Sequence, residues 1–292
     1  MKKFTMLTVF ALLLCLIGGC VSVDSACQVA ATTLPVYEFT SLLCRNTDIT
    51  VGRLVTENVS CLHDYSLQVS QTRMIESAEL IVISGAGLEA FLDDMLDNAK
   101  TLVDASAGIH THTGAHDHSN EDHAHSHECD PHIWLSPENA SIMASNICAG
   151  LTNAYPDHTA TFAANLEALL LKLDALQAYG DETLSQLDCR ELITFHDGFA
   201  YFAESFDLHI LRSVEEESGS EASAADLKSL IRLVEENSLP AVFTETNGSD
   251  SAAKIIRAET GAAIYSLDMA MSGDSYFDAM YHNIDVIKEA LG

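Results

Sequence analysis

The segment DHTATFAANLEALLLKLDALQAYGDETLSQL, residues 157–187, decides the fold of this chain. It contains no proline and a single glycine, Gly180, and its apolar residues recur at intervals of three and four. These apolar positions are Phe162, Leu166, Leu169, Leu170, Leu173, Leu176 and Leu184. Such spacing predicts one amphipathic helix, about 45 Å long if it is unbroken, because each residue adds about 1.5 Å. We interpret it as a helix that joins two separate blocks of the chain.

The sequence on either side of this helix alternates short β-branched runs with helical patterns, which is typical of an α/β protein with largely parallel strands. The expected strands are 28–33, 49–54, 80–84 and 101–104 before the helix, and 191–195, 208–213, 241–245 and 262–267 after it. The other expected helices are 36–45, 67–77, 88–99, 137–154, 200–206, 224–237, 251–260 and 276–290. The predicted fold class is therefore α/β, with two lobes that each hold a four-stranded, mainly parallel sheet flanked by helices.

The expected domain boundaries follow from this alternation and from the first residues of the chain. We expect an N-terminal lobe at 20–154, the connecting helix at 155–188 and a C-terminal lobe at 189–292. Residues 1–19 are typical of a lipoprotein signal peptide, because two lysines precede an apolar stretch that leads through Gly18-Gly19 to Cys20. The expected location is extracytoplasmic, with a lipid on Cys20 anchoring the chain to the bacterial cell membrane. An ordinary cleaved signal and an uncleaved anchor are the alternatives.

The chain is strongly acidic, with 43 Asp and Glu against 14 Lys and Arg and a net charge of −29 with His neutral. Nucleic-acid binding rewards clustered Lys and Arg, so this composition argues against it. An acidic surface attracts cations, although it does not specify a site for any one of them.

Six cysteines remain when Cys15 and Cys20 of the signal region are set aside: Cys27, Cys44, Cys61, Cys129, Cys148 and Cys189. An even number in an exported chain permits disulfides, but the sequence does not choose a pairing. Buried small apolar residues are the other interpretation. No two of these cysteines form a CxxC pair, so the sequence does not indicate a thiolate zinc site.

One tract, residues 110–127, holds seven histidines in eighteen residues together with Asp117, Glu121 and Asp122. It has no apolar periodicity, so it predicts a solvated loop that belongs to no packed core. Neutral imidazole is a good ligand for borderline ions such as Zn²⁺. We interpret the tract as a metal-collecting loop; a drifted low-complexity insertion is the alternative.

Three further histidines, His63, His132 and His196, each lie at the end of a predicted strand or in the turn after it, beside an aspartate. Ligands of open parallel sheets bind beyond the carboxyl ends of the strands, where such side chains gather. Each histidine is more than 60 residues from the next, which excludes a local zinc finger and requires a site assembled by the fold.

A closed zinc site is normally tetrahedral, so we expect a fourth ligand, and Asp268 has the corresponding place after a predicted strand of the second lobe. Asp64, Asp130 and Asp197 are the candidates to orient the imidazoles. The remaining histidines outside the tract, His158, His209 and His282, lack these contexts, and we interpret them as surface or structural residues.

Two motifs carry a family resemblance: Asp130-Pro131-His132-Ile133-Trp134-Leu135-Ser136-Pro137 and Phe195-His196-Asp197-Gly198-Phe199-Ala200-Tyr201-Phe202. Thr244-Glu245-Thr246, Glu259-Thr260-Gly261 and Leu267-Asp268 add to them. Over nearly the whole mature sequence the chain resembles the zinc- and manganese-binding solute-binding lipoproteins of metal ABC transporters, cluster A-I. The resemblance implies two lobes joined by one long helix, with the metal held between them.

Carried over by position, the resemblance implies that His63, His132 and His196 are metal ligands and that Asp268 is the carboxylate ligand. Some members place a Glu before the first histidine. Here that residue is Leu62, which cannot bind a metal ion, so Asp268 is favoured as the carboxylate ligand. The approach to His63 also departs from the family's proline-rich pattern, and Cys61 is either half of a bridge or a neighbour of the metal. The implied partners are an ABC permease and its ATPase, and the chain is expected to be a monomer.

Three histidines and a histidine-rich loop favour Zn²⁺ as the transported ion, whereas Mn²⁺ prefers harder oxygen ligands and remains the alternative. Metal binding requires neutral imidazoles, so the affinity is expected to fall as the pH drops through about 6. The leading hypothesis is capture without catalysis, followed by release through a small lobe movement. An exported zinc hydrolase and a surface adhesin are the competing hypotheses.

Overall fold

The computed structural model describes residues 27–59, 62, 65–96, 101–112, 129–215 and 222–292 of the 292-residue chain. Several predictions from the sequence lie outside these residues: the signal peptide at 1–19, Cys20, Cys61, His63, Asp64 and most of the histidine-rich tract at 110–127. They stay predictions.

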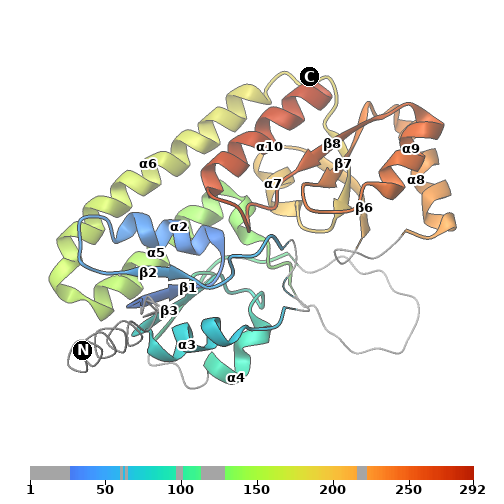
Figure 1. Cartoon of the computed structure of the whole chain (residues 1–292). Helices are drawn as coiled ribbons and strands as arrows, with labels where there is room; N and C mark the ends of the chain where they lie inside the picture. The colour runs from blue at the N-terminus through green and yellow to red at the C-terminus, as the bar shows by residue number, and fades with distance from the viewer. Residues whose placement is uncertain (1–26, 60–61, 63–64, 97–100, 113–128, 216–221) are drawn as a thin grey trace, which may run out of the picture.

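The N-terminal sheet holds four parallel strands in the order β2-β1-β3-β4. These strands are β1 (Val29–Ala31), β2 (Val51–Arg53), β3 (Leu80–Ile83) and β4 (Leu102–Asp104). Helices α2 (Leu34–Leu43) and α5 (Pro137–Ala154) pack on one face of the sheet, and α3 (Val69–Ser77) and α4 (Asp93–Leu96) pack on the other (Figure 1). Ser136 caps α5, because its hydroxyl accepts the backbone N–H of Asn139 at 3.3 Å.

The C-terminal sheet repeats this arrangement, with parallel strands in the order β6-β5-β7-β8. The strands are β5 (Glu191–His196), β6 (His209–Glu215), β7 (Ala241–Glu245) and β8 (Ala263–Leu267). Helices α7 (Ala200–Ser205) and α10 (Tyr276–Leu291) cover one face, and α8 (Ala224–Asn237) and α9 (Ser251–Thr260) cover the other. The predicted fold class is confirmed, since each lobe has a four-stranded parallel sheet between helices.

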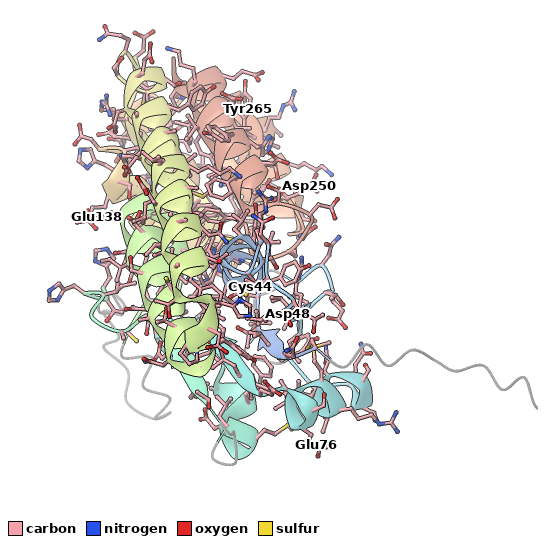
Figure 2. The ribbon with its side chains drawn as sticks, turned by 90° about the vertical axis from the view of Figure 1, so that its left-hand side faces the viewer. Cys44, Asp48, Glu76, Glu138, Asp250 and Tyr265 are labelled. Carbon is pink, nitrogen blue, oxygen red and sulfur yellow. The ribbon has the colours of Figure 1, made fainter. Side chains whose placement is uncertain are left out.

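The long helix is α6 (Thr159–Thr183), which follows a short 3₁₀ turn at Pro156–His158. Its 25 residues span about 37 Å, less than expected, because the helix begins two residues later and ends four residues earlier than predicted. Just past its end, Arg190 donates to the carbonyl oxygen of Leu184 at 2.8 Å. Helix α6 packs against α2 and α5 of the first lobe and against α10 of the second. Figure 2 shows it running along most of the height of the molecule, from below the level of Asp48 up to that of Tyr265.

The two lobes share one continuous apolar core, which includes Val82 of the first sheet, Leu173 of α6 and Leu267 of the second sheet. A polar junction adds to it where three helices meet. Glu38 of α2 accepts the backbone N–H of Tyr276 at 2.6 Å, and Lys172 of α6 lies 3.9 Å from the same carboxylate. A continuous core of this kind opposes wide separation of the lobes, because separation would expose apolar surface to water.

The predicted helix at 88–99 begins later than expected, with a 3₁₀ turn at Ala90–Leu92 followed by α4, and residues 97–99 lie outside the described ranges. The reason for the late start is Glu89, which is 3% exposed and whose carboxylate turns back toward the end of β3. It accepts the backbone N–H groups of Ser84 at 2.7 Å and Gly85 at 3.0 Å, and the hydroxyl of Thr32 at 2.6 Å. Glu89 therefore links the carboxyl ends of β1 and β3, and the regular helix begins only after it, at Asp93.

Five of the six counted cysteines are described, and all five are free thiols: Cys27, Cys44, Cys129, Cys148 and Cys189. Burial raises the pKa of the Cys44 thiol to about 12, so this group behaves as a small apolar residue. The disulfide framework that an even count permits does not occur among these five. Within the described residues, no helix has the length and hydropathy that crossing a bilayer requires.

Gly180 provides a test of how α6 is attached to the second lobe. A Cβ at this position would lie 2.1 Å from the Phe206 ring, so Gly180→Ala forces apart two packed elements. We expect the substitution to lower the free energy of unfolding by roughly 1–3 kcal/mol, although alanine is the better helix former by about 1 kcal/mol. Thermal unfolding measures the effect.

The control for this test is Ala178→Gly, which changes helix propensity at an exposed position of the same helix. It should destabilise the protein by no more than about 1 kcal/mol. A Gly180→Ala protein that is more stable than the parent would contradict the packing of Phe206 on α6.

Candidate metal centre

The fold brings His132 and His196 together where the lobes meet. His196 is the last residue of β5, and His132 precedes a short 3₁₀ helix, Ile133–Leu135, that leads into α5. Their Nε2 atoms are 3.3 Å apart, and their ring planes are perpendicular. His132 is 8% exposed and His196 is 3% exposed. Two residues 64 positions apart therefore form one buried pair of nitrogen atoms. His196 lies at a strand end, as predicted. For His132 that prediction was wrong, because it precedes a 3₁₀ helix and the last described strand before it, β4, ends at Asp104.

Asp130 fixes the imidazole of His132. One of its carboxylate oxygens, Oδ1, lies 2.8 Å from Nδ1 of His132 and also accepts the backbone N–H of His132 at 2.9 Å. A carboxylate accepts hydrogen bonds, so the ring proton of neutral His132 belongs on Nδ1 and the lone pair on Nε2. The expectation that Asp130 orients this imidazole is confirmed. Asp64 lies outside the described residues, and the exposed Asp197 accepts a hydrogen bond from Ser213 at 3.1 Å.

Gly198 lets both imidazoles approach the loop after β8. A Cβ there would lie 2.7 Å from Cδ2 of His196, 3.1 Å from Cε1 of His132 and 2.6 Å from Cε of Met269. Real Cβ atoms do not make such short contacts, so any larger residue would push the rings or Met269 away. The third residue of the His-Asp-Gly motif is therefore a glycine because a side chain at this position would collide with the surrounding residues.

Asp268 follows β8 and is half-buried, and the side chain of the next residue, Met269, lies against Gly198. Asn283 of α10 holds the backbone of Asp268 from both sides, with N···O distances of 2.7 Å at the amide and at the carbonyl. Its carboxylate oxygen Oδ1 accepts the backbone N–H of Ala270 at 2.7 Å. The main chain at Asp268 is therefore firmly placed by Asn283 of α10.

Trp134 is an important residue to which the sequence analysis assigned no role. It is fully buried, its indole N–H donates to the carbonyl oxygen of Met269 at 2.7 Å, and its own carbonyl accepts the hydroxyl of Tyr276 at 2.8 Å. Both partners belong to the other lobe. The signal was a single tryptophan two residues after a candidate ligand, but its partners are backbone and aromatic groups that no motif predicts.

Within the part of the chain that the structure describes, no group of three or more His, Cys, Asp or Glu side chains is close enough to hold a metal ion. Two of the four predicted ligands, His132 and His196, are in contact, and His63 lies outside the described residues. Asp268 is described, but only its neighbour Met269 reaches the cluster. The described geometry therefore brings together two of the predicted ligands, as two imidazole nitrogens on facing lobes.

The sequence matches a family model described as zinc-uptake complex component A, periplasmic (ZnuA), over residues 29–290. It is 29% identical to the zinc-binding lipoprotein AdcA of Streptococcus pneumoniae TIGR4, an alignment that covers 99% of this chain and 61% of AdcA. It is 31% identical to a putative metal-binding protein of Treponema pallidum, with 78% of this chain and 76% of that protein covered. The chain thus spans about three fifths of the length of the AdcA relative.

Solved structures share the fold. A crystal structure of ZnuA superposes with a TM-score of 0.81 at 30% identity, covering 91% of this chain and all of that one. The Zn(II)-bound ZnuA-like domain of Streptococcus pneumoniae AdcA gives 0.76 at 26% identity, covering 91% and 98%. The laminin-binding protein Lbp of Streptococcus pyogenes also gives 0.76, but at 22% identity the likeness shows the fold alone.

The family model covers the helix between the lobes, both histidine motifs and both sheets. The chain therefore belongs to the zinc-uptake complex component A (ZnuA) family.

Proposed function

We propose that this protein binds Zn²⁺ outside the cytoplasm and delivers it to an ABC permease, which imports the ion with the help of its ATPase. The observation that carries the proposal is the pair of buried imidazole nitrogens, 3.3 Å apart on facing lobes. A tetrahedral ion with Zn–N bonds of about 2.0–2.1 Å separates two ligand nitrogens by about 3.3–3.4 Å. The pair is therefore spaced for one zinc ion.

The pair can bind a cation when both imidazole rings are neutral and each Nε2 carries its lone pair. Asp130 already holds the proton of His132 on the far nitrogen, which leaves Nε2 for the ion. In the metal-free protein, Nε2–H of His196 can donate to that lone pair, and zinc binding displaces this proton. His63 and the carboxylate of Asp268 complete the proposed set of four ligands.

The choice of zinc over manganese rests on ligand chemistry. Imidazole is a borderline ligand that suits Zn²⁺, whereas Mn²⁺ is bound better by carboxylate and carbonyl oxygens. A set of three imidazoles and one carboxylate therefore favours zinc. Family membership supports the same choice, and so do the zinc-binding relative and the Zn(II)-bound neighbour.

Capture and release are proposed in place of catalysis. A zinc hydrolase needs an open coordination position for water, and Asp268 would fill that position here. The lipid anchor on Cys20 is part of the proposal, since it would hold the protein next to its permease. Esterase or phosphatase turnover by the zinc-loaded protein would favour the hydrolase instead.

The two described ligands provide the main test. His132→Ala and His196→Ala should each weaken zinc binding more than about 100-fold, because losing a group that only orients a ligand already costs about 10- to 100-fold. Competition with a chromophoric chelator measures the affinity. The matched control is His209→Ala, which removes an exposed histidine at the opposite end of the same sheet. Full zinc affinity in His196→Ala would refute the site.

Thermal unfolding with added metal separates zinc from manganese. An ion that binds only the folded state at about 100 times its Kd stabilises it by about 2.7 kcal/mol, so zinc should raise the Tm by several degrees. Mn²⁺ at the same concentration should raise it less, and a His132→Ala/His196→Ala double variant should respond to neither ion. A larger Tm increase with manganese would favour the manganese-binding alternative.

A further inference from the structure

His112, within the histidine-rich tract, and Asp130, shortly after it, are in direct contact. The backbone N–H of Asp130 donates to the carbonyl oxygen of His112 at 2.9 Å. The described residues on the two sides of the undescribed part of the tract therefore meet at one place. That place is next to the metal centre, because Asp130 is the residue that orients His132.

The hydroxyl of Tyr201, in α7 of the other lobe, lies at this junction. It accepts the backbone N–H of His112 at 3.0 Å and donates to the carbonyl oxygen of Asp130 at 2.8 Å. Tyr201 is 2% exposed, and burial raises its pKa to about 12, so the hydroxyl keeps its proton at neutral pH. Its ring also packs on the ring of His112, with centroids 4.4 Å apart.

A second contact from α7 is weaker. Glu204 lies 2.9 Å from Nε2 of His112, but the two side chains are 70% and 42% exposed. Exposed ion pairs contribute little to stability, because water screens them and ordering the side chains costs entropy. The buried hydroxyl of Tyr201 is therefore the principal polar tie between α7 and this junction.

A continuous series of contacts connects Tyr201 to the two imidazoles of the candidate metal centre. Tyr201 holds the main chain of Asp130, Asp130 holds the ring of His132, and the ring of His132 faces that of His196. His196 ends β5, which leads directly into the helix that carries Tyr201. The lobe that carries His196 therefore helps to fix the orientation of Asp130. Through Asp130 it also helps to fix the direction of the His132 lone pair.

We propose that Tyr201 is a positioning residue for zinc binding, which acts through Asp130 to hold His132 at the distance from His196 that the ion requires. This inference rests on the proposed function. Preorganised ligands bind more tightly because less conformational freedom is lost when the ion arrives. Without the hydroxyl, Asp130 loses its direct hydrogen bond to the second lobe, and the ring of His132 is held less firmly toward His196.

Tyr201→Phe tests the proposal, because it removes only the hydroxyl and keeps the buried ring. We expect zinc affinity, measured by chelator competition, to fall roughly three- to tenfold, the effect of one hydrogen bond. The matched control is Tyr155→Phe, which loses a hydroxyl that lies 3.1 Å from Glu79, near the start of β1 at the opposite end of the first sheet. Its affinity should equal that of the parent protein.

A double-mutant cycle with Asp130→Ala, which removes the acceptor for His132, distinguishes positioning from general loosening of the fold. If Tyr201 acts through Asp130, then Tyr201→Phe should have little further effect on zinc affinity in the Asp130→Ala protein. Fully additive losses would overturn the proposal, and so would a Tyr201→Phe protein with unchanged affinity.

A second readout needs no metal. The Nδ1–H proton of His132, hydrogen-bonded to Asp130, should give an NMR resonance that is lost in Asp130→Ala, weakened or in faster exchange in Tyr201→Phe, and unchanged in Tyr155→Phe. An unchanged resonance in Tyr201→Phe would overturn the proposal even if that variant were less stable. Failure of the proposed function would look different, since His196→Ala would then retain zinc affinity while this resonance still responded to Tyr201→Phe.

Discussion

The geometry of the interlobe junction depends on Trp134, whose hydrogen bonds fix one lobe against the other. Its indole N–H donates to the carbonyl oxygen of Met269, and its own carbonyl accepts the hydroxyl of Tyr276. All three residues are buried from water. Leaving either buried group without a partner would cost about 1–3 kcal/mol, so the register between the lobes is strongly specified. His132 is two residues before Trp134, and Asp268 is one residue before Met269. The same contacts that join the lobes therefore place the candidate ligands from both sides.

Besides this junction, the two lobes are joined by a shared apolar core. One apolar core runs from the first sheet past α6 into the second, and Glu38, Lys172 and Tyr276 link three helices beside it. Opening the lobes widely would expose that core. Release of an ion is then expected to involve small shifts of loops at the strand ends, where Gly198 leaves no spare room between the rings and Met269. A slight displacement of one imidazole is enough to lose a bond of about 2 Å.

Affinity and release place opposite demands on the same few contacts. Asp130 and Tyr201 favour a preformed site by holding His132 toward His196. Both contacts cross or adjoin the boundary between the lobes, so a movement there changes the distance between the imidazoles directly. The histidine-rich tract is attached at this same boundary, through His112. The acidic composition of the chain complements this arrangement, because it raises the local concentration of cations without defining the site.

The sequence by itself determined the α/β class, all eight strands and the long helix, because periodicity and capping are local properties of the chain. It also selected His132 and His196 and proposed Asp130 as an orienting group, although only His196 lies at a strand end. The tertiary structure alone decided that the two imidazoles meet at 3.3 Å, that Glu89 delays the start of the helix after β3, and that Trp134 and Tyr201 join the lobes. The partners of these last three residues are largely backbone groups, many of them distant in the chain. Every residue carries such groups, so no residue pattern in the sequence could reveal the pairing.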